Sequence, residues 1–566
     1  MNVWKRWTAL AAAVALSLIV LSGCAGEGAD VSLAVCAGST PEDLDPIYAT
    51  QTGDQTILVH LYENLMRKTV DVSGGTTVTN GLAKSVEQED NYDGTYTWTF
   101  RLRSARWSDG RRVRANDFVY AWQRLADPAN ASPYADMLSV VAGYDQVQET
   151  GDVSLLQVSA ENDTTLVVVL NGKYDWFLDE VCTATATLPV RQDVIEAWET
   201  AAAAQETAAE EQESGEAGPA ETVEPWWADL EGLVTNGPYT VEDHTDGVSL
   251  TVTAFEDYHS AVGPSQIVFR FADTAEEAWA LYEQKEVDFV WELPQEQLEA
   301  AAEDEAAALT TELGTYAVLY RSDETILADP AVRRAMALAI DRNAVAAAAG
   351  ATARPAEGLV PPGVPGGEGE GDFRTDNALL DNEPAHFQER CQEARQILTE
   401  AGYQGQELGE LEYLYADIGS DQAVAQVLAD TWREVLGITV TPRGVTEEEL
   451  QAALESGTYT LVGVQLSAMG NDAECFLLPW SSQSGESITG YENSAYDTLM
   501  AVIASASDAA ARMGCLHDAE VLLLEDSALS PLYTTVTDWE LRDTLTGLCR
   551  DARGWFSFSG VTHRST

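Results

Sequence analysis

The sequence predicts an α/β protein with mixed sheets and more than one domain, and two observations carry this prediction. The first is an alternation of strand-like and helix-like segments through most of the chain after residue 236. Such alternation is typical of α/β units. The second is size and composition, because 566 residues, 45% of them hydrophobic, can bury a core large enough for two or three domains.

The first 30 residues have the features of an export signal. Lys5 and Arg6 precede an apolar run over 8–20, which is shorter than the roughly 20 residues that a membrane span needs. The run ends in LSGC, which resembles a bacterial lipobox with Cys24 as the lipidated residue. We therefore expect a signal peptide at 1–23 and a lipidated tether at 24–30. The alternative is an uncleaved anchor helix with an incidental cysteine.

The first folded elements are predicted to be a strand and a helix. The strand begins near residue 31 and leads into a proline-bounded loop. In the stretch 55–67, Ile57, Leu58 and Leu61 recur at helical spacing, which predicts one buried helix face.

An arginine-rich stretch over 101–128 follows, with seven arginines. The alternating pattern of 96–103, which overlaps the start of this stretch, predicts a half-buried strand with arginines on its solvent face. A turn is expected at 108–110, then a helix capped by Asn116 and ended by Pro128. We expect these arginines to neutralise nearby carboxylates; an anion-binding patch is the alternative.

Further along, loops, helices and strands alternate. The segment 201–225 is rich in Ala and Glu without apolar periodicity, which predicts an acidic, mobile surface insertion. A Pro/Gly loop is expected at 354–372. The remaining predicted elements are strands at 236–241, 266–273, 410–416 and 438–445, a helix then a strand over 275–291, and helices at 329–346, 387–403 and 421–437.

Charge and motifs exclude several functions. Acidic residues outnumber basic ones by 93 to 31, so the net charge of −62 repels nucleic acid and anionic lipid surfaces. The sequence contains no G-x-S-x-G or H-E-x-x-H motif and no P-loop, and none of its six histidines pair at zinc-ligand spacing. We therefore expect no catalytic residues, metal or cofactor.

Six cysteines remain besides Cys24, and none form a C-x-x-C motif. An extracytoplasmic compartment permits disulfides, but the sequence leaves their pairing open and allows free thiols.

Several segments, in this order, resemble the family 5 extracellular solute-binding proteins of bacterial ABC importers, the oligopeptide- and dipeptide-binding family. The resemblance runs from about residue 43 to residue 558, and its most specific part is 96–138. The other segments that carry it are 44–46 (LDP), 61–67 (LYENLMR), 235–241 (TNGPYTV), 329–342 (DPAVRRAMALAIDR), 358–364 (GLVPPGV), 428–440 (LADTWREVLGITV) and 491–500 (YENSAYDTLM).

This resemblance implies a type II periplasmic-binding-protein-like fold of the cluster C kind, with two lobes that close on a hinge and one extra domain. The implied limits are 31–68, 189–312 and 538–566 for lobe I, 69–188 for the extra domain and 313–537 for lobe II. The two hinge crossings are then expected near residues 312 and 537.

The resemblance also implies that an extended peptide is bound mainly through its backbone, much as in strand addition. The implied ligand-binding residues are Thr52 and Gly53 in TQTGD, Tyr134 in SPYA, Gln465 and Ser467 in GVQLSAMGND, and Tyr533 in PLYT. Ordinary packing is the alternative for the two tyrosines.

One departure from the family pattern concerns the ends of the peptide. Family members that bind oligopeptides place an Asp in an ADYNEP-like segment to pair with the peptide ammonium group. Here Met469 occupies that position, and Asp472 is the candidate replacement, unless the anchor is absent. The arginine that some members use for the carboxylate end falls at Gly463.

By this resemblance, the protein is a lipid-anchored, extracytoplasmic binding protein rather than an enzyme. It is expected to act as a monomer that captures peptides and delivers them to the permease subunits of an ABC importer, whose ATPase is a separate chain. The alternatives are a non-peptide solute such as a sugar or metal chelate, or a peptide-signal sensor. A secreted hydrolase ranks below these.

Overall fold

The computed structural model describes most of the chain. The described residues are 31–70, 75–212, 224–291, 293–303, 310–321, 325–367, 371–375, 377–403, 410–468, 470–482, 489–506, 508–537 and 539–564. Among them, no helix combines the length and apolar character that crossing a membrane requires. The predicted signal peptide and tether, with Cys24, lie outside the described residues.

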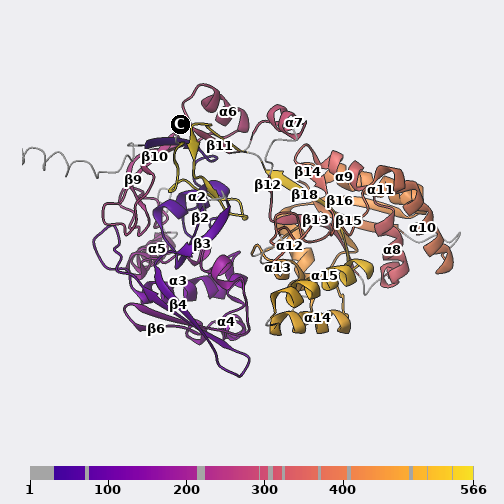
Figure 1. Cartoon of the computed structure of the whole chain (residues 1–566), viewed down its shortest axis with the longest axis horizontal. Coiled ribbons are helices and arrows are strands. Elements are labelled where there is room, and N and C mark those ends of the chain that lie inside the picture. The colour runs from indigo at the N-terminus through magenta and orange to yellow at the C-terminus, as the bar shows by residue number, and fades with distance from the viewer. Residues whose placement is uncertain are drawn as a thin grey trace, which may run out of the picture.

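Two lobes lie side by side, and the first is built on a six-stranded mixed sheet (Figure 1). In this sheet β1 is central and parallel to β10 and β11, whereas the other pairs are antiparallel. The strand order is β19 (Trp539–Leu541), β11 (Phe289–Trp291), β1 (Val31–Cys36), β10 (Pro264–Arg270), β9 (Ser249–Ala254) and β8 (Tyr239–Thr245).

The last residues of the chain return to this first lobe and pack on α2 (Thr52–Leu61). The backbone N–H of Phe558 donates to Nε2 of His60 at 2.9 Å, and His60 Nδ1 lies 2.6 Å from the carbonyl of Thr56. Complete burial lowers the pKa of His60 to about 4. His60 is therefore a neutral structural residue that links α2 to the last segment of the chain by a hydrogen bond.

A four-stranded antiparallel sheet lies beside the first lobe and packs on α3 (Ala115–Ala126). Trp98 and Phe100 of β5 are buried while Arg101 is exposed, so the predicted alternation is confirmed. The strand order is β4 (Ala83–Asp90), β5 (Tyr96–Leu102), β7 (Thr165–Leu170) and β6 (Val158–Asn162).

The predicted cap of α3 at Asn116 is wrong. The capping position is Arg114, two residues earlier, and the carboxylate of Asp117 accepts the backbone N–H of Arg114 at 2.9 Å. A carboxylate in the first turn accepts a free N–H group, and its negative charge also interacts favourably with the helix dipole. A neutral amide lacks this charge.

The expected role is confirmed for five of the seven arginines, which form ion pairs with carboxylates. Arg101 lies 3.8 Å from Glu87 and Arg114 lies 3.8 Å from Asp163, both on the surface. Arg124 differs, because it is buried and makes a bidentate pair with Asp45 at 2.6 and 2.7 Å.

The second lobe contains a seven-stranded mixed sheet. Helices α8 (Pro330–Leu338), α9 (Arg342–Ala349), α10 (Phe387–Glu400) and α11 (Asp421–Leu436) cover one face, and α12 (Glu447–Ser456), α13 (Ala473–Leu477), α14 (Ser494–Ser505) and α15 (Ala509–Glu525) cover the other. The strand order is β12 (Thr310–Thr311), β18 (Leu529–Thr537), β13 (Gly314–Tyr320), β17 (Leu461–Ser467), β15 (Glu410–Ala416) and β16 (Thr439–Val445), with β14 (Ala353–Pro355) paired to β18.

The single helix predicted over 329–346 is two helices, α8 and α9. The carboxylate of Asp341 accepts the backbone N–H of Ala344 at 3.2 Å, so it starts a new helix where the apolar pattern alone suggested a continuous one.

Two chain segments cross between the lobes next to each other. The chain leaves the first lobe after β11 and returns between β18 and β19, and Thr310 and Thr311 pair with Thr537 and Val536. Two adjacent crossings allow a rotation of one lobe against the other, as in a hinge. The domain limits derived from the sequence stay a prediction.

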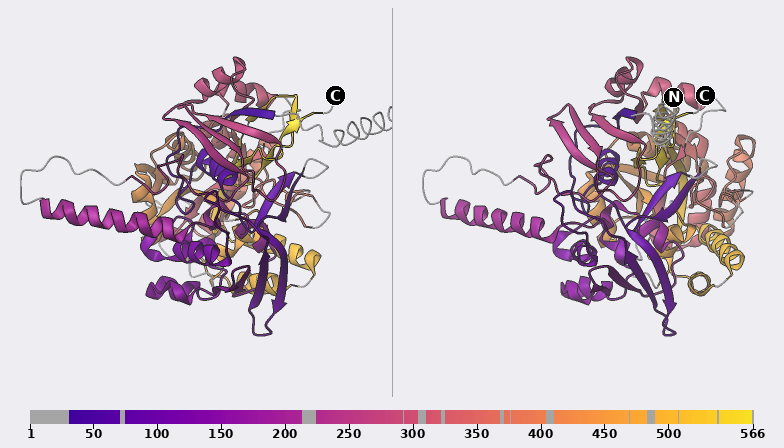
Figure 2. Two further views of the ribbon diagram at one scale, coloured as in Figure 1. Left: turned by 90° about the vertical axis from the view of Figure 1, so that its left-hand side faces the viewer. Right: turned by 60° about the vertical axis from the view of Figure 1, so that its left-hand side comes forward.

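The acidic insertion predicted at 201–225 begins within a helix. Helix α5 (Gln192–Gln212) continues through residue 212 and projects from the body of the molecule (Figure 2). Ala, Glu and Gln favour helix even without an apolar face, which explains why periodicity missed it. Residues 213–223 lie outside the described residues.

Five cysteines of the described chain are free thiols, and all but one of these are buried. They are Cys182, Cys391, Cys475, Cys515 and Cys549, of which Cys515 is partly exposed.

Candidate functional site

A cavity of about 490 Å³ lies between the lobes. This size falls in the range of small-molecule and peptide pockets, roughly 300–1,000 Å³. Its lining comes from four parts of the chain: residues 50–55 and 550–554 with Trp291 in the first lobe, residues 133–137 and 184–186 beside it, the hinge residues 312–313, and residues 465–468 of the second lobe.

Beside the first lobe, Tyr134 is held in place at the cavity wall. Its hydroxyl donates to the carbonyl of Ala49 at 3.1 Å and accepts from Nε2 of Gln55 at 2.9 Å. Burial raises the pKa of Tyr134, so the hydroxyl stays protonated and keeps its donor role. Thr52, the first residue of α2, lines the same cavity.

From the second lobe, β17 brings Gln465 and Ser467 to the cavity. Both side chains are exposed, and they lie on the same side of the strand because their positions differ by two. Among the described strands, β15 pairs only with Leu461 and Val462 of β17, which leaves 463–467 without a partner strand on that edge. An unpartnered edge beside a cavity can accept the backbone of an extended ligand.

Two arginines from the last segment give the cavity positive charge. Arg550 donates from Nη2 to Thr537 Oγ1 at 3.0 Å, while its buried Nε has no hydrogen-bond partner. Burial lowers the pKa of Arg550, and Glu312 at the hinge opposes this shift. Arg553 is bound instead by Asp551 at 2.9 Å. Arg550 is therefore the cation with spare donor capacity.

Arg553 belongs to a buried network of four charges below the cavity. Lys68 lies 2.6 Å from Asp551 and 3.2 Å from Glu180, and Arg553 donates to the carbonyl of Glu180 at 3.0 Å. Burial alone would raise the pKa of Asp551, but Arg553 and Lys68 outweigh it and hold that pKa well below 3.8. Of this network Arg553 lines the cavity, and its guanidinium is already bound by Asp551, the carbonyl of Glu180 and Thr183.

Negative charge reaches the cavity from two sides. Asp136 lies beside Tyr134, and its carboxylate accepts from the hydroxyl of Tyr144 at 2.6 Å. Glu312 lines the cavity at the hinge. The cavity therefore offers both signs of charge to a ligand.

Of the eight residues predicted from the sequence, one lies outside the described residues, three do not line this cavity, and four lie around it. Thr52, Tyr134, Gln465 and Ser467 line it. Gly53 lies at a neighbouring cavity of about 160 Å³, where a side chain would meet the carbonyl of Ala37. Met469 lies outside the described residues.

The structure places Asp472 and Tyr533 away from the cavity. Asp472 is bound by Arg512 at 2.9 and 3.2 Å and caps α13, so it is already paired. Tyr533 is buried and stacks on Tyr316 at 4.9 Å between ring centres, which is the packing alternative. At the Gly463 position, the hydroxyls of Tyr413 and Tyr316 fill the space that a side chain would need.

Sequence reasoning missed the residues that give the cavity most of its charge and aromatic surface. Trp291, Arg550 and Glu312 line it without any motif. The one available signal was a pair of arginines at 550 and 553 within a strongly acidic chain, and it indicates charge but not position.

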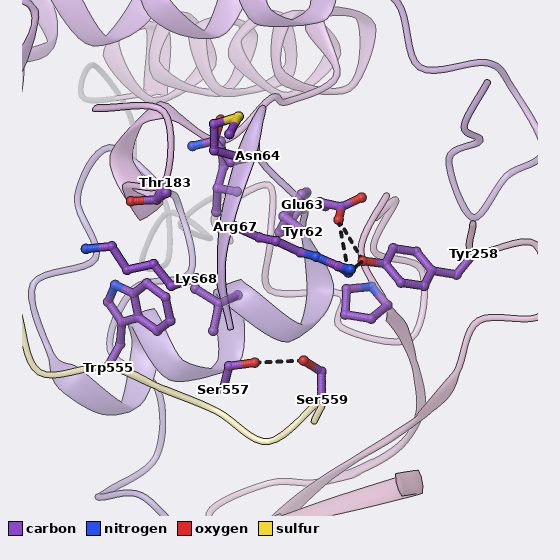
Figure 3. Close-up of a pocket in the computed structure, with 14 residues that line it drawn as sticks. Tyr62, Glu63, Asn64, Arg67, Lys68, Thr183, Tyr258, Trp555, Ser557 and Ser559 are labelled. Atoms are coloured by element: carbon purple, nitrogen blue, oxygen red, sulfur yellow. Dashed lines mark hydrogen bonds and ion pairs between the residues drawn. The ribbon is translucent and has the colours of Figure 1, made fainter. Parts of the chain in front are cut away.

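A second, much smaller cavity of about 50 Å³ lies within the first lobe (Figure 3). The carboxylate of Glu63 in its wall already has partners: the hydroxyl of Tyr258 donates to it at 2.7 Å, and His259, which does not line the cavity, lies 2.5 Å from it. Arg67 donates to that hydroxyl at 3.1 Å. This volume holds a few water molecules at most, so the cavity does not suit a peptide.

The described residues contain no group of three or more His, Cys, Asp or Glu side chains placed to hold a metal ion.

The amino-acid sequence is similar to known bacterial binding proteins. The family model described as bacterial extracellular solute-binding proteins, family 5 Middle, matches residues 77–487. The probable deoxycholate-binding periplasmic protein YgiS of Escherichia coli is 27% identical, with 88% of this chain and 86% of that protein covered. The periplasmic oligopeptide-binding protein OppA of the same organism is also 27% identical, with the same shares covered.

Among solved structures, the unliganded open form of the periplasmic murein tripeptide binding protein MppA aligns with a TM-score of 0.71 at 23% identity. The alignment covers 94% of this chain and 97% of that one. The predicted fold class, two-lobed and type II periplasmic-binding-protein-like, is therefore confirmed.

Proposed function

Because the chain belongs to the family 5 bacterial extracellular solute-binding proteins, we propose that it captures peptides in the cavity between its lobes. The observation that carries this proposal is the unpartnered edge of β17 beside the cavity. An extended peptide can add to that edge through its backbone, so affinity depends little on the peptide's side chains. The relation to OppA, which is named as an oligopeptide-binding protein, supports the same ligand class.

The charges of the cavity suit both ends of a zwitterionic peptide. Asp136 is exposed and offers a carboxylate to the ammonium group, and Arg550 offers a guanidinium to the carboxylate group. In this proposal Asp136 replaces the anchor that Met469 cannot supply. Asp472 is not needed, since Arg512 already neutralises it.

Native mass spectrometry of the purified protein is the first test. A ladder of bound masses that correspond to peptides supports the proposal, because sequence-tolerant binding retains a mixture. A single non-peptide mass contradicts it and redirects the search to another solute. Release of the ligand and a second mass measurement should return the peptide unchanged, because a binding protein does not turn it over.

Calorimetry with matched variants tests the two anchors. We expect Asp136→Asn to weaken binding of a free tripeptide about tenfold, or about 1.4 kcal/mol, and to leave the N-acetylated peptide unaffected. The asparagine can still accept from Tyr144, so the local fold is kept. Arg550→Gln should weaken the free peptide but not its C-terminal amide. Asp430→Asn, an exposed change on α11, serves as the control.

A second candidate ligand is an amphipathic carboxylate such as a bile acid. The relation to a probable deoxycholate-binding protein favours it, as do the apolar Trp291, Met137 and Leu313 in the cavity wall. Such a ligand carries no ammonium group. Binding of deoxycholate that needs Arg550 but not Asp136, together with no binding of peptides, would establish this candidate instead.

The proposal includes delivery from the membrane surface. The protein is anchored through lipid on Cys24, outside the cytoplasm, and passes its ligand to the permease subunits of an ABC importer with a separate ATPase. Replacement of Cys24 by Ala should release the protein to the medium. Unchanged retention in the membrane fraction would contradict lipid anchoring. A gene deletion that leaves peptide uptake intact but abolishes a peptide response would indicate a sensor.

A further inference from the structure

The second lobe contains another cavity, of about 280 Å³, that shares no lining residue with the interlobe cavity. Helices α8, α9 and α10 line it, together with the end of α15 and with β18. Figure 1 shows α8 and α10 on the side of the second lobe that faces away from the first lobe. A ligand here would lie outside the cleft.

Three arginines converge on this cavity, although basic residues are scarce in the chain. They are Arg334 on α8, Arg342 at the start of α9 and Arg390 on α10. Arg342 is 4% exposed and Arg390 is 9% exposed. Charged side chains buried to this degree are normally paired, because burial of an unneutralised charge is costly.

Arg342 has no carboxylate partner among the described residues. Its Nε donates to the carbonyl of Pro531 at 2.7 Å, and no other hydrogen bond or ion pair of its guanidinium is found there. Burial lowers the pKa of Arg342 to about 10, Tyr320 partly opposes this, and the positive charge of Arg390 lowers it further. One buried guanidinium therefore lies close to another.

Arg390 is only weakly paired. Its Nη1 lies 3.5 Å from the carboxylate of Asp381, which also binds His386 at 3.0 Å. Both Nε and Nη1 of Arg390 are buried without a hydrogen-bond partner. Arg334 is half-buried and forms no hydrogen bond or ion pair within the described residues. The cavity thus has more donors than acceptors.

The carboxylates of the lining do not balance these charges. Asp381 and Glu393 are both exposed, whereas two of the three arginines are buried. The remaining wall is mostly apolar and is formed by Ala337, Leu338, Leu379, Leu380, Leu524, Leu529 and Pro531, with Ser530 as its one hydroxyl.

We propose that this cavity is a second binding site, which takes a small organic anion. A carboxylate or phosphate group would accept from Arg342 and Arg390, with Arg334 nearer the opening, and an apolar body would lie against the leucines. A planar guanidinium suits both oxyanions, since it can donate two parallel hydrogen bonds. This proposal concerns a different cavity from the peptide site and does not rest on it.

The test is binding of hexanoate and of inorganic phosphate to the purified protein, by calorimetry and by thermal unfolding. Each is compared with sodium chloride at equal ionic strength, because any salt screens the repulsion within a chain of net charge −62. We expect a saturable response to at least one anion, with the unfolding temperature rising with the logarithm of its concentration. Stronger binding of hexanoate indicates an organic carboxylate, and stronger binding of phosphate indicates a phosphate ester.

Matched variants assign the response to this cavity. Arg342→Gln and Arg390→Gln should each weaken anion binding at least tenfold, whereas Arg433→Gln, which removes an exposed arginine of α11, should not. Peptide binding in the interlobe cavity should be unchanged in all three variants, which also verifies folding. Three outcomes would overturn the proposal. The anion response could equal that of chloride, it could persist in both cavity variants, or a peptide could displace the anion.

A measurement on the unaltered chain covers the case in which the variants do not fold. Phenylglyoxal should label the half-buried Arg334, and a bound anion should slow this labelling relative to that of Arg433. Equal rates with and without the anion would also overturn the proposal.

Discussion

The buried network below the cavity leads to the sharpest prediction, which is that Asp551→Asn strongly destabilises the first lobe. Asp551 is fully buried and lies 2.6 Å from Lys68 and 2.9 Å from Arg553. The substitution keeps the shape of the side chain but removes its charge. Glu180 then remains as the one carboxylate of a network that contains two cations.

The expected magnitude follows from this charge balance. Two cations and two carboxylates make the native network neutral, and Asp551→Asn leaves one uncompensated positive charge in a buried site. Removal of one partner from a buried ion pair costs about 3–5 kcal/mol. Lys68→Met leaves the opposite imbalance. The double variant restores neutrality, so its loss should be smaller than the sum of the single losses by about 1–3 kcal/mol.

The assay must resolve the lobes, because a chain of several domains need not unfold in one step. Hydrogen exchange read by mass spectrometry does this. Asp551→Asn should speed exchange in 549–558 and 177–188, which the network joins, and should leave α11 and β18 of the second lobe unchanged. Asp430→Asn, which removes an exposed partner of Arg433, should change neither region.

The pH dependence provides a further check. Because the pKa of Asp551 is lowered in the folded state, its contribution is present above its unfolded value near 3.9 and is lost as the pH falls further. The difference between the wild type and Asp551→Asn should therefore shrink below pH 4. Equal protection of all regions in the two proteins at pH 7, or a double variant that is fully additive, would refute this reasoning.

Two further predictions concern stability. Burial raises the pKa of Asp54 to about 6, so ionisation of this carboxylate lowers the stability of the folded protein as the pH rises from about 4 through 6. Across that range the free energy of unfolding of the wild type should fall by about 2 kcal/mol relative to that of Asp54→Asn, as measured by urea unfolding at each pH. The absence of any pH-dependent difference would contradict this. Gly463→Ala would force a methyl group against the hydroxyl of Tyr413 and should cost about 1–3 kcal/mol. By contrast, Gly514→Ala should raise the free energy of unfolding by up to about 1 kcal/mol, because this position lies within α15 and faces open space. Equal effects of the two substitutions would contradict the prediction for Gly463, since they would show that the crowding there is easily relieved.

Local patterns predicted much of the secondary structure and part of the site. The alternation in β5 and the apolar face of α3 depend on residues within about a dozen positions, so the sequence shows them directly. The ordered segments of the family resemblance placed Thr52, Tyr134, Gln465 and Ser467, and the structure brings these four to one cavity. The same reasoning failed where local chemistry competes with periodicity, as at the cap of α3.

Only the tertiary structure decided which charges meet. Lys68 and Asp551 are separated by almost the whole length of the chain, and Asp472 is paired with Arg512 of α15. Arg342 lies near Arg390 and has no carboxylate partner among the described residues. In a chain with 93 acidic residues, composition offers many partners for each arginine, and the packing of distant segments selects among them. The sequence by itself thus determined the family, the fold class and the strands and helices that approach the cleft. The charges that would hold a ligand were decided by contacts that no local pattern encodes.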